Sequence, residues 1–277
     1  MAICTMEPLL KRAQIGKYAV GAFNVHSLEG AQAIVAAAEE ELSPVILQIN
    51  QATIDYAGLK PIAAMVQAVA SEARVPVAIN LDHCTDFGTA VQCMAEGFTA
   101  VMFDGSSMSL EQNIDAVGQV VRIAKTLGVD VEGEVGRIGG VEDDLIVGDS
   151  CYTDVNSAEK FVRETGVCCL AVAVGTAHGV YRSEPRLDIQ RLEEIARGVK
   201  VPLVLHGGSG LPDEAVKEAI ARGICKVNVS TELKKAFVTS LDVSSDDPRK
   251  VLGATREAMK RIVRHKIRAF GSSAKAS

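Results

Sequence analysis

Eight short apolar segments of β-type composition alternate with helical patterns from one end of the chain to the other. The predicted strands are residues 18–24, 44–50, 76–81, 99–104, 129–135, 168–174, 201–205 and 224–229. The predicted helices are residues 28–41, 59–74, 86–96, 109–127, 156–165, 189–197, 212–222, 232–241 and 249–270. Nearly continuous apolar strands that alternate with helices are typical of a parallel sheet covered on both faces. Eight such units favour a closed (β/α)8, or TIM, barrel with extra C-terminal helices.

Chain length agrees with a single barrel. The 277 residues are 48% hydrophobic and 23% charged, which is ordinary globular composition, and a barrel commonly takes this length as one domain. No shift in composition marks a boundary, so we predict one domain over residues 1–277. An open doubly wound sheet is the alternative. Against it, the turn at residues 24–30 lacks the glycine-rich fingerprint of dinucleotide-binding sheets.

Composition also limits the cellular setting and the partners. The net charge of −6 disfavours nucleic acid as a partner. We expect no signal peptide, because residues 1–6 are short and uncharged, and no segment is apolar for long enough to span a membrane. The seven cysteines form no CxxC pair and are interpreted as thiols in a reducing cytoplasm. The small, polar tail at residues 271–277 is expected to fray.

Every predicted strand delivers a polar residue to its C-terminal end. In order these are Asn24, Asn50, Asp82 with His83, Asp104, Glu134, His178 (slightly beyond its strand), His206 and Asn228. In a barrel all these ends meet at one rim, where active sites lie. A single His or Asn there is more often a satisfied hydrogen-bonding group, but the complete set indicates a metal site or acid–base chemistry.

Three of the five histidines belong to this rim. Three imidazoles leave one coordination position open, which is how catalytic zinc sites are built, although Co²⁺ and Ni²⁺ suit the same ligands. His26 lies in the first rim loop, where an approach to substrate is possible but not favoured. His265 lies in a basic helical stretch and is interpreted as structural.

Glycine-rich segments follow the last two strands. His206-Gly-Gly-Ser-Gly210 and Asn228-Val-Ser-Thr231 each lead into a helix, and Gly179 follows His178. Loops at these places in a barrel commonly bind phosphate through backbone N–H groups and helix N-termini. Two adjacent loops of this kind beside a candidate metal site predict a phosphorylated substrate.

These segments together resemble the class II, metal-dependent fructose-bisphosphate and tagatose-bisphosphate aldolases. The resemblance extends over nearly the whole chain, from Gly21 to Ser272. It is carried by Asn80-Leu-Asp-His83, Glu132-Gly-Glu-Val-Gly136, Gly139-Gly-Val-Glu-Asp143, Gly175-Thr-Ala-His-Gly179, His206-Gly-Gly-Ser-Gly210 and Lys226-Val-Asn-Val-Ser-Thr231.

The resemblance implies a role for each matching residue. His83, His178 and His206 would hold Zn²⁺, and Asp104 and Glu134 would lie at a second metal position. Asp82 would exchange the proton of the C4 hydroxyl, and Glu142, on a mobile loop, the C–H proton of dihydroxyacetone phosphate. The implied contacts to substrate and phosphate, with a monovalent cation nearby, are Asn24, Gly179, Gly207, Gly208, Ser209, Asn228, Val229, Ser230 and Thr231.

The chemistry of ketose cleavage is consistent with these roles. Breaking the C3–C4 bond leaves negative charge that a Lewis acid stabilises, and a neighbouring carboxylate takes the hydroxyl proton. A loop bearing Glu142 and hinged at Gly136, Gly139 and Gly140 would exclude water on closing. Without the resemblance, Glu142 would be interpreted as part of a solvated acidic loop.

Two departures from the family pattern concern the distal end of the substrate. Many relatives carry a small Ser or Thr where this chain has Asn50 and Gln51, so these two residues are candidate determinants of the ketose. Arg256 is a candidate for binding the distal phosphate from a neighbouring subunit, and an exposed helical arginine is an equal alternative. The family commonly forms dimers or tetramers, so a homo-oligomer is expected by analogy.

The sequence therefore predicts a zinc aldolase that splits fructose 1,6-bisphosphate into dihydroxyacetone phosphate and glyceraldehyde 3-phosphate. Tagatose 1,6-bisphosphate and a ketose phosphate with a distal sulfonate or a deoxy sugar are alternatives. A Schiff-base aldolase would need a lysine inside the barrel, and Lys226 is the only one placed within a predicted strand. A non-catalytic phosphosugar-binding protein and a metal-dependent hydrolase are further alternatives.

Overall fold

In the computed structural model the chain forms a closed barrel of eight parallel strands, described at all residues except 1, 143–144, 148–150, 180, 182–184 and 277. Around the barrel the strand order is β1-β10-β9-β8-β5-β4-β3-β2. The strands are β1 (Val20–Asn24), β2 (Val45–Asn50), β3 (Val77–Cys84), β4 (Ala100–Phe103), β5 (Asp130–Val135), β8 (Cys169–Val172), β9 (Leu203–Leu205) and β10 (Ile224–Val229). The predicted (β/α)8 barrel is confirmed.

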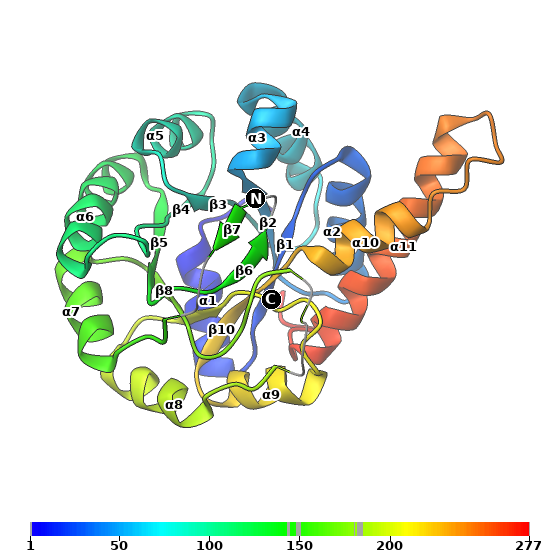
Figure 1. The fold of residues 1–277 in the computed structure, drawn as a ribbon. Helices are drawn as coiled ribbons and strands as arrows, with labels where there is room; N and C mark the ends of the chain where they lie inside the picture. Colours follow the sequence, from blue (N-terminus) through cyan, green and yellow to red (C-terminus); the bar gives the residue numbers. More distant parts are fainter. Residues whose placement is uncertain (1, 143–144, 148–150, 180, 182–184, 277) are drawn as a thin grey trace.

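Helices surround the barrel (Figure 1). They are α2 (Leu28–Glu40), α3 (Gln51–Ala57), α4 (Leu59–Ser71), α5 (Phe87–Ala95), α6 (Leu110–Leu127), α7 (Val155–Thr165), α8 (Ile189–Gly198), α9 (Asp213–Ala221), α10 (Thr231–Thr239) and α11 (Pro248–Ala269). In the described part of the chain, none of the helices combines the length and apolar character that a bilayer crossing requires.

One helix not predicted from the sequence closes the N-terminal end of the barrel. It is α1 (Met6–Gly16), whose apolar face buries Met6, Leu9 and Leu10 against the bottom of the barrel interior. The backbone N–H of Glu7 donates to Asp130 at the start of β5, over 2.6 Å. Since one end is sealed in this way, access to the barrel interior lies at the C-terminal rim.

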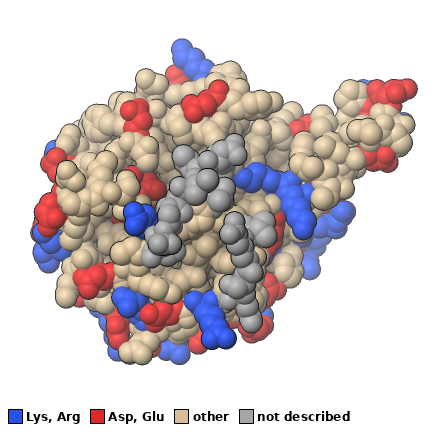
Figure 2. Space-filling model, viewed as in Figure 1, with Lys and Arg blue, Asp and Glu red and all other residues tan. Residues whose placement is uncertain are grey.

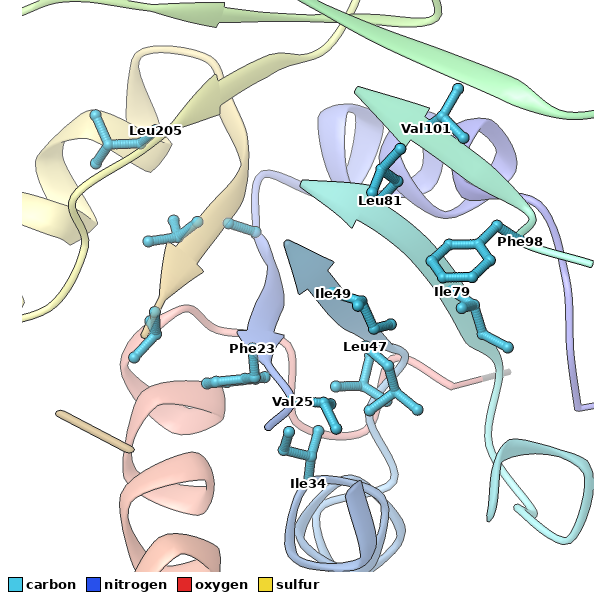
Figure 3. Packing of buried hydrophobic residues seen from close by; sticks show 14 of the residues in the cluster. Phe23, Val25, Ile34, Leu47, Ile49, Ile79, Leu81, Phe98, Val101 and Leu205 are labelled. Carbon is cyan, nitrogen blue, oxygen red and sulfur yellow. The ribbon is translucent and has the colours of Figure 1, made fainter. Parts of the chain in front are cut away.

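Strand residues alternate between two packing layers. In β1, β2 and β3, odd-numbered residues such as Phe23, Leu47 and Ile79 belong to the outer layer between strands and helices, which also contains Ile34 of α2 (Figure 3). In β8 the outward residues are the even-numbered Leu170 and Val172. The inward residues at the bottom of the strands are apolar, for example Ala78 and Ile46. Higher on the same inward face the residues become polar, because successive side chains of a strand alternate between its faces.

Two further elements lie beside the C-terminal rim. A hairpin of β6 (Gly140–Glu142) and β7 (Leu145–Val147) lies over the barrel in Figure 1, in the segment that was expected to be a mobile loop. An arm made by α10 and the start of α11 projects from the barrel. On the face shown in Figure 2, Lys and Arg side chains are interspersed with Asp and Glu, and acidic residues gather at the tip of this arm.

The expectation that the C-terminal tail frays is wrong for its described residues. Ser272 is fully buried, and the N–H groups of Ala274 and Ala276 donate to the carbonyls of Glu41 and Leu42. The tail is thereby bound to the end of α2. Local composition gave no sign of this contact, because its partners lie more than 200 positions away in the sequence.

Candidate metal centre

Three imidazole rings converge at the C-terminal rim. His83 is the penultimate residue of β3, His178 follows β8 and His206 follows β9. Ring centroids are 4.8 Å apart for His83 and His178, 4.5 Å for His83 and His206, and 5.9 Å for His178 and His206. One nitrogen from each ring lies within 4.8 Å of the others, so the three histidines form a group that can hold one metal ion.

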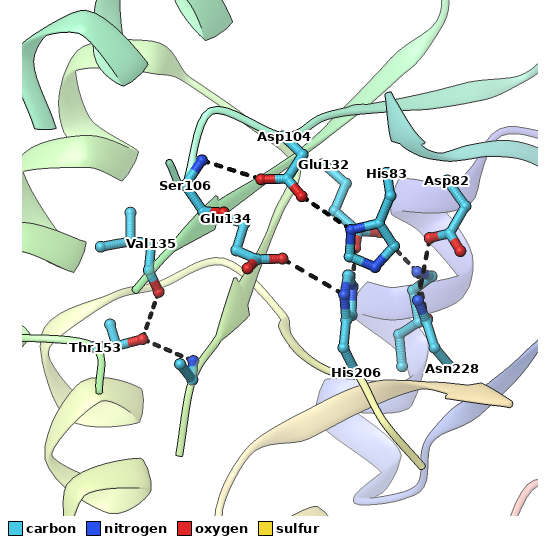
Figure 4. A network of polar contacts seen from close by, with 12 residues as sticks. Asp82, His83, Asp104, Ser106, Glu132, Glu134, Val135, Thr153, His206 and Asn228 are labelled. Carbon is cyan, nitrogen blue, oxygen red and sulfur yellow. Dashed lines mark hydrogen bonds and ion pairs between the residues drawn. The ribbon is translucent and has the colours of Figure 1, made fainter. Parts of the chain in front are cut away.

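Beneath the rings, a buried ion pair orients His206. Nε2 of His206 lies 2.9 Å from Oε1 of Glu132 (Figure 4). Oε2 of the same carboxylate lies 2.8 Å from Nζ of Lys226. All three side chains are fully buried. Burial raises the pKa of Glu132, but Lys226 and His206 outweigh it and lower that pKa to about 2. The ionised carboxylate only accepts hydrogen bonds, so Nε2 carries the hydrogen and Nδ1 presents a lone pair.

Two carboxylates form a second group with His83. Oδ2 of Asp104 lies 3.0 Å from Nδ1 of His83, and Glu134 completes a triad whose ligand atoms lie within 4.8 Å of one another. Burial raises the pKa of Asp104, but the contact with His83 outweighs it and holds that pKa below its usual range. Burial and the Asp104 charge raise the pKa of Glu134 well above its usual value.

The electrostatic setting of the histidines suits a metal ion. Burial, with the charge of neighbouring imidazoles, lowers the pKa of His178 and of His206, so both rings are neutral and able to ligate. Nδ1 of His206 and Oε2 of Glu134 face each other at 3.5 Å, and neither atom has a hydrogen-bond partner among the described residues. Buried polar atoms of this kind are rare unless an ion or water satisfies them. The donor set therefore fits Zn²⁺.

Asp82 lies beside the three histidines and is held by two amides. Its side chain is 1% exposed; Nδ2 of Asn24 donates to Oδ2 and Nδ2 of Asn228 donates to Oδ1, each over 3.2 Å. Its position next to His83 in β3 places it at the same rim. A buried carboxylate fixed in this way is arranged to exchange a proton with a group bound next to the metal.

The hydrogen-bonded chain continues into residues that the sequence analysis did not select. Nε2 of Gln48 donates to Asn24 over 3.4 Å, and Nδ2 of Asn80 donates to Gln48 over 3.3 Å. Both residues are fully buried and lie two positions before a predicted rim residue on the same strand. The period of two along a strand is the signal that could have found Gln48, Asn80 and also Glu132.

The predicted phosphate loops meet around a small pocket. Its lining comprises His178, Gly179, Gly207, Ser209, Asn228, Ser230 and Thr231. Gly207 has φ +67°, and an added Cβ would lie 2.4 Å from the carbonyl oxygen of Ala177, so only glycine fits there. The N–H of Gly208 is already bonded to the carbonyl of Asn228, and the Val229 side chain is buried in the outer layer.

Two side chains fix the shape of this pocket. Oγ of Ser209 accepts from the N–H groups of Ser230 and Glu232, at the start of α10. The hydroxyl of Tyr181, which the sequence analysis missed, donates to the carbonyl of Gly207 and accepts from the N–H of Ala177. The loops after β8, β9 and β10 are therefore joined to one another, a connection that no local sequence signal marks.

The other predicted residues lie further from the three rings or make local contacts. Asn50 caps α3 by accepting from the N–H of Thr53, and Gln51 donates to Asp55 of the same helix. Arg256 donates to Gln32 of α2 on the exposed surface of the same chain. His26 contacts Thr53, and His265 pairs with Asp213.

Glu142 is the last residue of β6, opposite Leu145. Its side chain lies outside the part of the chain that the structure describes. The hairpin is joined to the metal centre at its base, because Gly140 pairs with His178 and the N–H of His178 donates to the carbonyl of Gly139. The backbone thus carries Glu142 on an element that contacts a candidate ligand directly.

Comparisons with known proteins agree with this geometry. A family model described as "Fructose-bisphosphate aldolase class-II" matches residues 4–275. The chain is 43% identical over 286 residues to a fructose-bisphosphate aldolase of Geobacillus stearothermophilus, with both chains covered completely. It is also 43% identical over 284 residues to a sulfofructosephosphate aldolase of Alkalicoccus urumqiensis, covering 100% of this chain and 99% of that one.

A solved structure gives the same result for the fold. The crystal structure of the YdjI aldolase from Escherichia coli K12 superposes with a TM-score of 0.89 at 31% identity, covering 99% of this chain and 100% of that one. The likeness therefore extends over nearly the whole chain.

Proposed function

Because the chain belongs to the class II fructose-bisphosphate aldolase family and is a carbon–carbon lyase, we propose that it cleaves a ketose bisphosphate reversibly with Zn²⁺ as its metal. Fructose 1,6-bisphosphate is the proposed substrate, split into dihydroxyacetone phosphate and glyceraldehyde 3-phosphate. The observation that carries the proposal is the convergence of His83, His178 and His206 beside the buried carboxylate of Asp82.

The proposed mechanism assigns the metal to the three imidazoles. His83, His178 and His206 would hold Zn²⁺, with Asp104 and Glu134 offering a second position beside His83. Bound there, the ion supplies a Lewis acid next to the carbon–carbon bond that breaks.

Proton transfer is assigned to two carboxylates. Asp82, held by the amides of Asn24 and Asn228, takes the proton of the C4 hydroxyl as the C3–C4 bond breaks and returns it in the condensation direction. Glu142 exchanges the C–H proton at C3 of dihydroxyacetone phosphate. The hairpin that carries it excludes water when substrate is bound.

Phosphate recognition is assigned to the pocket between the last three rim loops. Backbone and hydroxyl groups of Gly179, Gly207, Ser209, Ser230 and Thr231 surround it. Neutral donors at a helix N-terminus suit a phosphate because they supply partial positive charge without a counter-ion. A monovalent cation near this phosphate is part of the proposal.

A ketose phosphate with a distal sulfonate is the second candidate substrate. The chain is equally identical, at 43%, to a relative named fructose-bisphosphate aldolase and to one named sulfofructosephosphate aldolase. Overall identity therefore favours neither, and the difference is assigned to the distal subsite, for which Asn50, Gln51 and Arg256 are the candidates. Tagatose 1,6-bisphosphate differs only in the configuration at C4.

A Schiff-base mechanism is disfavoured by the surroundings of Lys226. This residue is 0% exposed, and its Nζ contacts both Glu132 and Asn228 at 2.8 Å. Substrate would have to enter the polar layer beneath the metal centre to reach it.

We further propose that residues 1–277 form one domain and that the protein works in the cytoplasm, in glycolysis, as a homodimer or homotetramer.

The test is cleavage of fructose 1,6-bisphosphate, tagatose 1,6-bisphosphate and the 6-sulfonate analogue side by side. Each is measured as prepared, after EDTA, and after Zn²⁺ is restored. We expect turnover that EDTA abolishes and Zn²⁺ restores, with fructose 1,6-bisphosphate preferred. Turnover that resists EDTA, or a covalent adduct trapped by borohydride, would overturn the zinc assignment. Phosphate binding without turnover of any ketose, or release of inorganic phosphate alone, would overturn the aldolase assignment.

A further inference from the structure

Lys226 contacts a partner of the metal-binding residue His206 and a partner of the carboxylate Asp82, but neither of these two residues itself. Its Nζ lies 2.8 Å from Oε2 of Glu132, which orients His206, and 2.8 Å from Oδ1 of Asn228, which contacts Asp82. It is fully buried, as are Glu132 and His206. We propose that Lys226 is a positioning residue that fixes the tautomer of His206 and the orientation of the Asn228 amide.

The first branch of this argument concerns the metal ligand. An ammonium group only donates hydrogen bonds, so it keeps the facing oxygen of Glu132 as an acceptor. The other oxygen of that carboxylate then accepts from Nε2 of His206. This leaves the lone pair of Nδ1 directed towards the metal position, which is the arrangement that an oriented histidine ligand needs.

The second branch concerns the proton-transferring carboxylate. The oxygen and nitrogen of an Asn amide can exchange places, and only the hydrogen-bond partners decide which way it points. Because Lys226 only donates, it takes Oδ1 of Asn228 and turns Nδ2 towards Asp82. On the other side of Asp82, Nδ2 of Asn24 donates while its Oδ1 accepts from Gln48.

Buried charge without a partner is costly, which explains why Lys226 and Glu132 occur together. Removing one partner of such a pair is strongly destabilising, whereas replacing both by uncharged groups of similar shape is often neutral. A pair retained only to balance charge would therefore be replaceable without loss of function. The inference requires the opposite result, since the direction of two hydrogen-bond chains depends on the ammonium.

The experiment compares Lys226→Met, Glu132→Gln and the double variant Lys226→Met/Glu132→Gln with the wild-type enzyme. Five quantities are measured: Tm, zinc affinity by competition with a chelating dye, kcat, KM and the tautomer of His206. The tautomer is obtained from ¹⁵N spectra of the imidazoles in the zinc-free protein, with His206 assigned by the loss of its signals in His206→Gln. Glu41→Gln, which alters a carboxylate paired with Arg264 and Arg268, is the control for stability loss elsewhere.

The expected result separates stability from positioning. Lys226→Met lowers Tm, and the double variant recovers most of that loss because no unpaired charge remains. The double variant nevertheless shows a mixture of His206 tautomers, with zinc affinity and kcat each reduced about 10- to 100-fold, while the wild type shows the Nε2–H form alone. The control variant keeps wild-type zinc affinity, kcat and tautomer.

Recovery of kcat, zinc affinity and a single tautomer together with Tm in the double variant would overturn the inference, because Lys226 would then only balance charge. The inference rests on the proposed metal site, but the experiment can refute the proposed function and the role of Lys226 independently. A wild-type protein that binds no zinc and cleaves no ketose phosphate would refute the proposed function. The His206 tautomer in the zinc-free variants would still decide the role of Lys226.

Discussion

At the scale of single residues, the geometry of the candidate site follows from groups that can only donate or only accept hydrogen bonds. The Lys226 ammonium only donates and the Asp82 carboxylate only accepts, so the Asn228 amide between them has one favourable orientation. The Glu132 carboxylate likewise only accepts, from Lys226 on one side. The rim thus presents its groups already oriented, which lowers the reorganisation that a reaction would otherwise require.

Asp82→Asn is expected to lower kcat by roughly 10²–10⁴-fold, because the amide cannot take the hydroxyl proton. Zinc content should be unchanged, since the three imidazoles remain. The measurement is kcat together with zinc per chain by elemental analysis. Asp86→Asn is the matched control: Asp86 caps α5 through the N–H of Thr89, and Asn caps a helix equally well. Retention of more than a tenth of kcat in Asp82→Asn would contradict the assigned role.

At the scale of secondary-structure elements, the β6–β7 hairpin is joined at its base to the loop that carries His178. Gly140 has φ +120°, and an added Cβ would lie 2.3 Å from the carbonyl oxygen of His178. A side chain there would displace β6, which carries Glu142, or the loop that carries His178, or both.

Gly140→Ala is therefore expected to lower kcat at least about tenfold, with strain of roughly 1–3 kcal/mol. Gly128→Ala is the matched control, because Gly128 also has positive φ, +67°, but an added Cβ meets nothing within 4 Å. The control should lose stability and keep kcat. Equal kcat in the two variants would show that the hairpin does not have to pack this closely.

A second element-scale prediction concerns the contact between α2 and α11. Glu41 at the end of α2 pairs with Arg264 and Arg268, and its side chain is 8% exposed. The Arg268 contact, with Arg264 and Ser273, lowers its pKa despite partial burial. Glu41→Gln is expected to reduce the free energy of unfolding by about 1 kcal/mol at pH 7, measured by denaturant titration.

The pH dependence of that difference follows from the direction of the shift. A carboxylate whose folded pKa is lowered contributes stability above its unfolded pKa of 4.5, and the contribution is lost as the pH falls below that value. The difference in the free energy of unfolding between wild type and Glu41→Gln should therefore disappear on acidification. Glu214→Gln is the control, because the Glu214 side chain is 85% exposed in its ion pair with Lys217. It should leave the free energy of unfolding unchanged both at pH 7 and in acid. A gap that widens with acid would refute the assignment.

At the scale of the whole molecule, a metal held by residues from three strands should stabilise the closed barrel. Zinc at about 1,000 times its Kd adds roughly 4 kcal/mol, so EDTA is expected to lower Tm by roughly 10 °C. His178→Gln should abolish this difference, and His265→Gln, on the exposed face of α11, should keep it. An identical Tm with and without EDTA in the wild type would contradict the proposed centre.

The barrel and much of its rim could be predicted from the sequence because both follow from local pattern. Apolar runs alternating with helices imply parallel strands, and parallel strands bring their C-terminal ends to one rim. His83, His178 and His206 meet there as expected. Two helices were missed. The apolar face of α1 is buried only because the helix packs on the bottom of the barrel, which no local signal reveals. The short helix α3 follows β2 directly, without a loop between them.

The sequence by itself determined which groups reach the rim, because strand period and strand direction are local properties of the chain. Only the tertiary structure decided how those groups are oriented and what holds them. Lys226 belongs to β10 and Glu132 to β5, two strands far apart in the sequence, so their contact exists only after the barrel closes. Likewise the tail packed against the end of α2, since its partners Glu41 and Leu42 lie more than 200 positions away in the sequence.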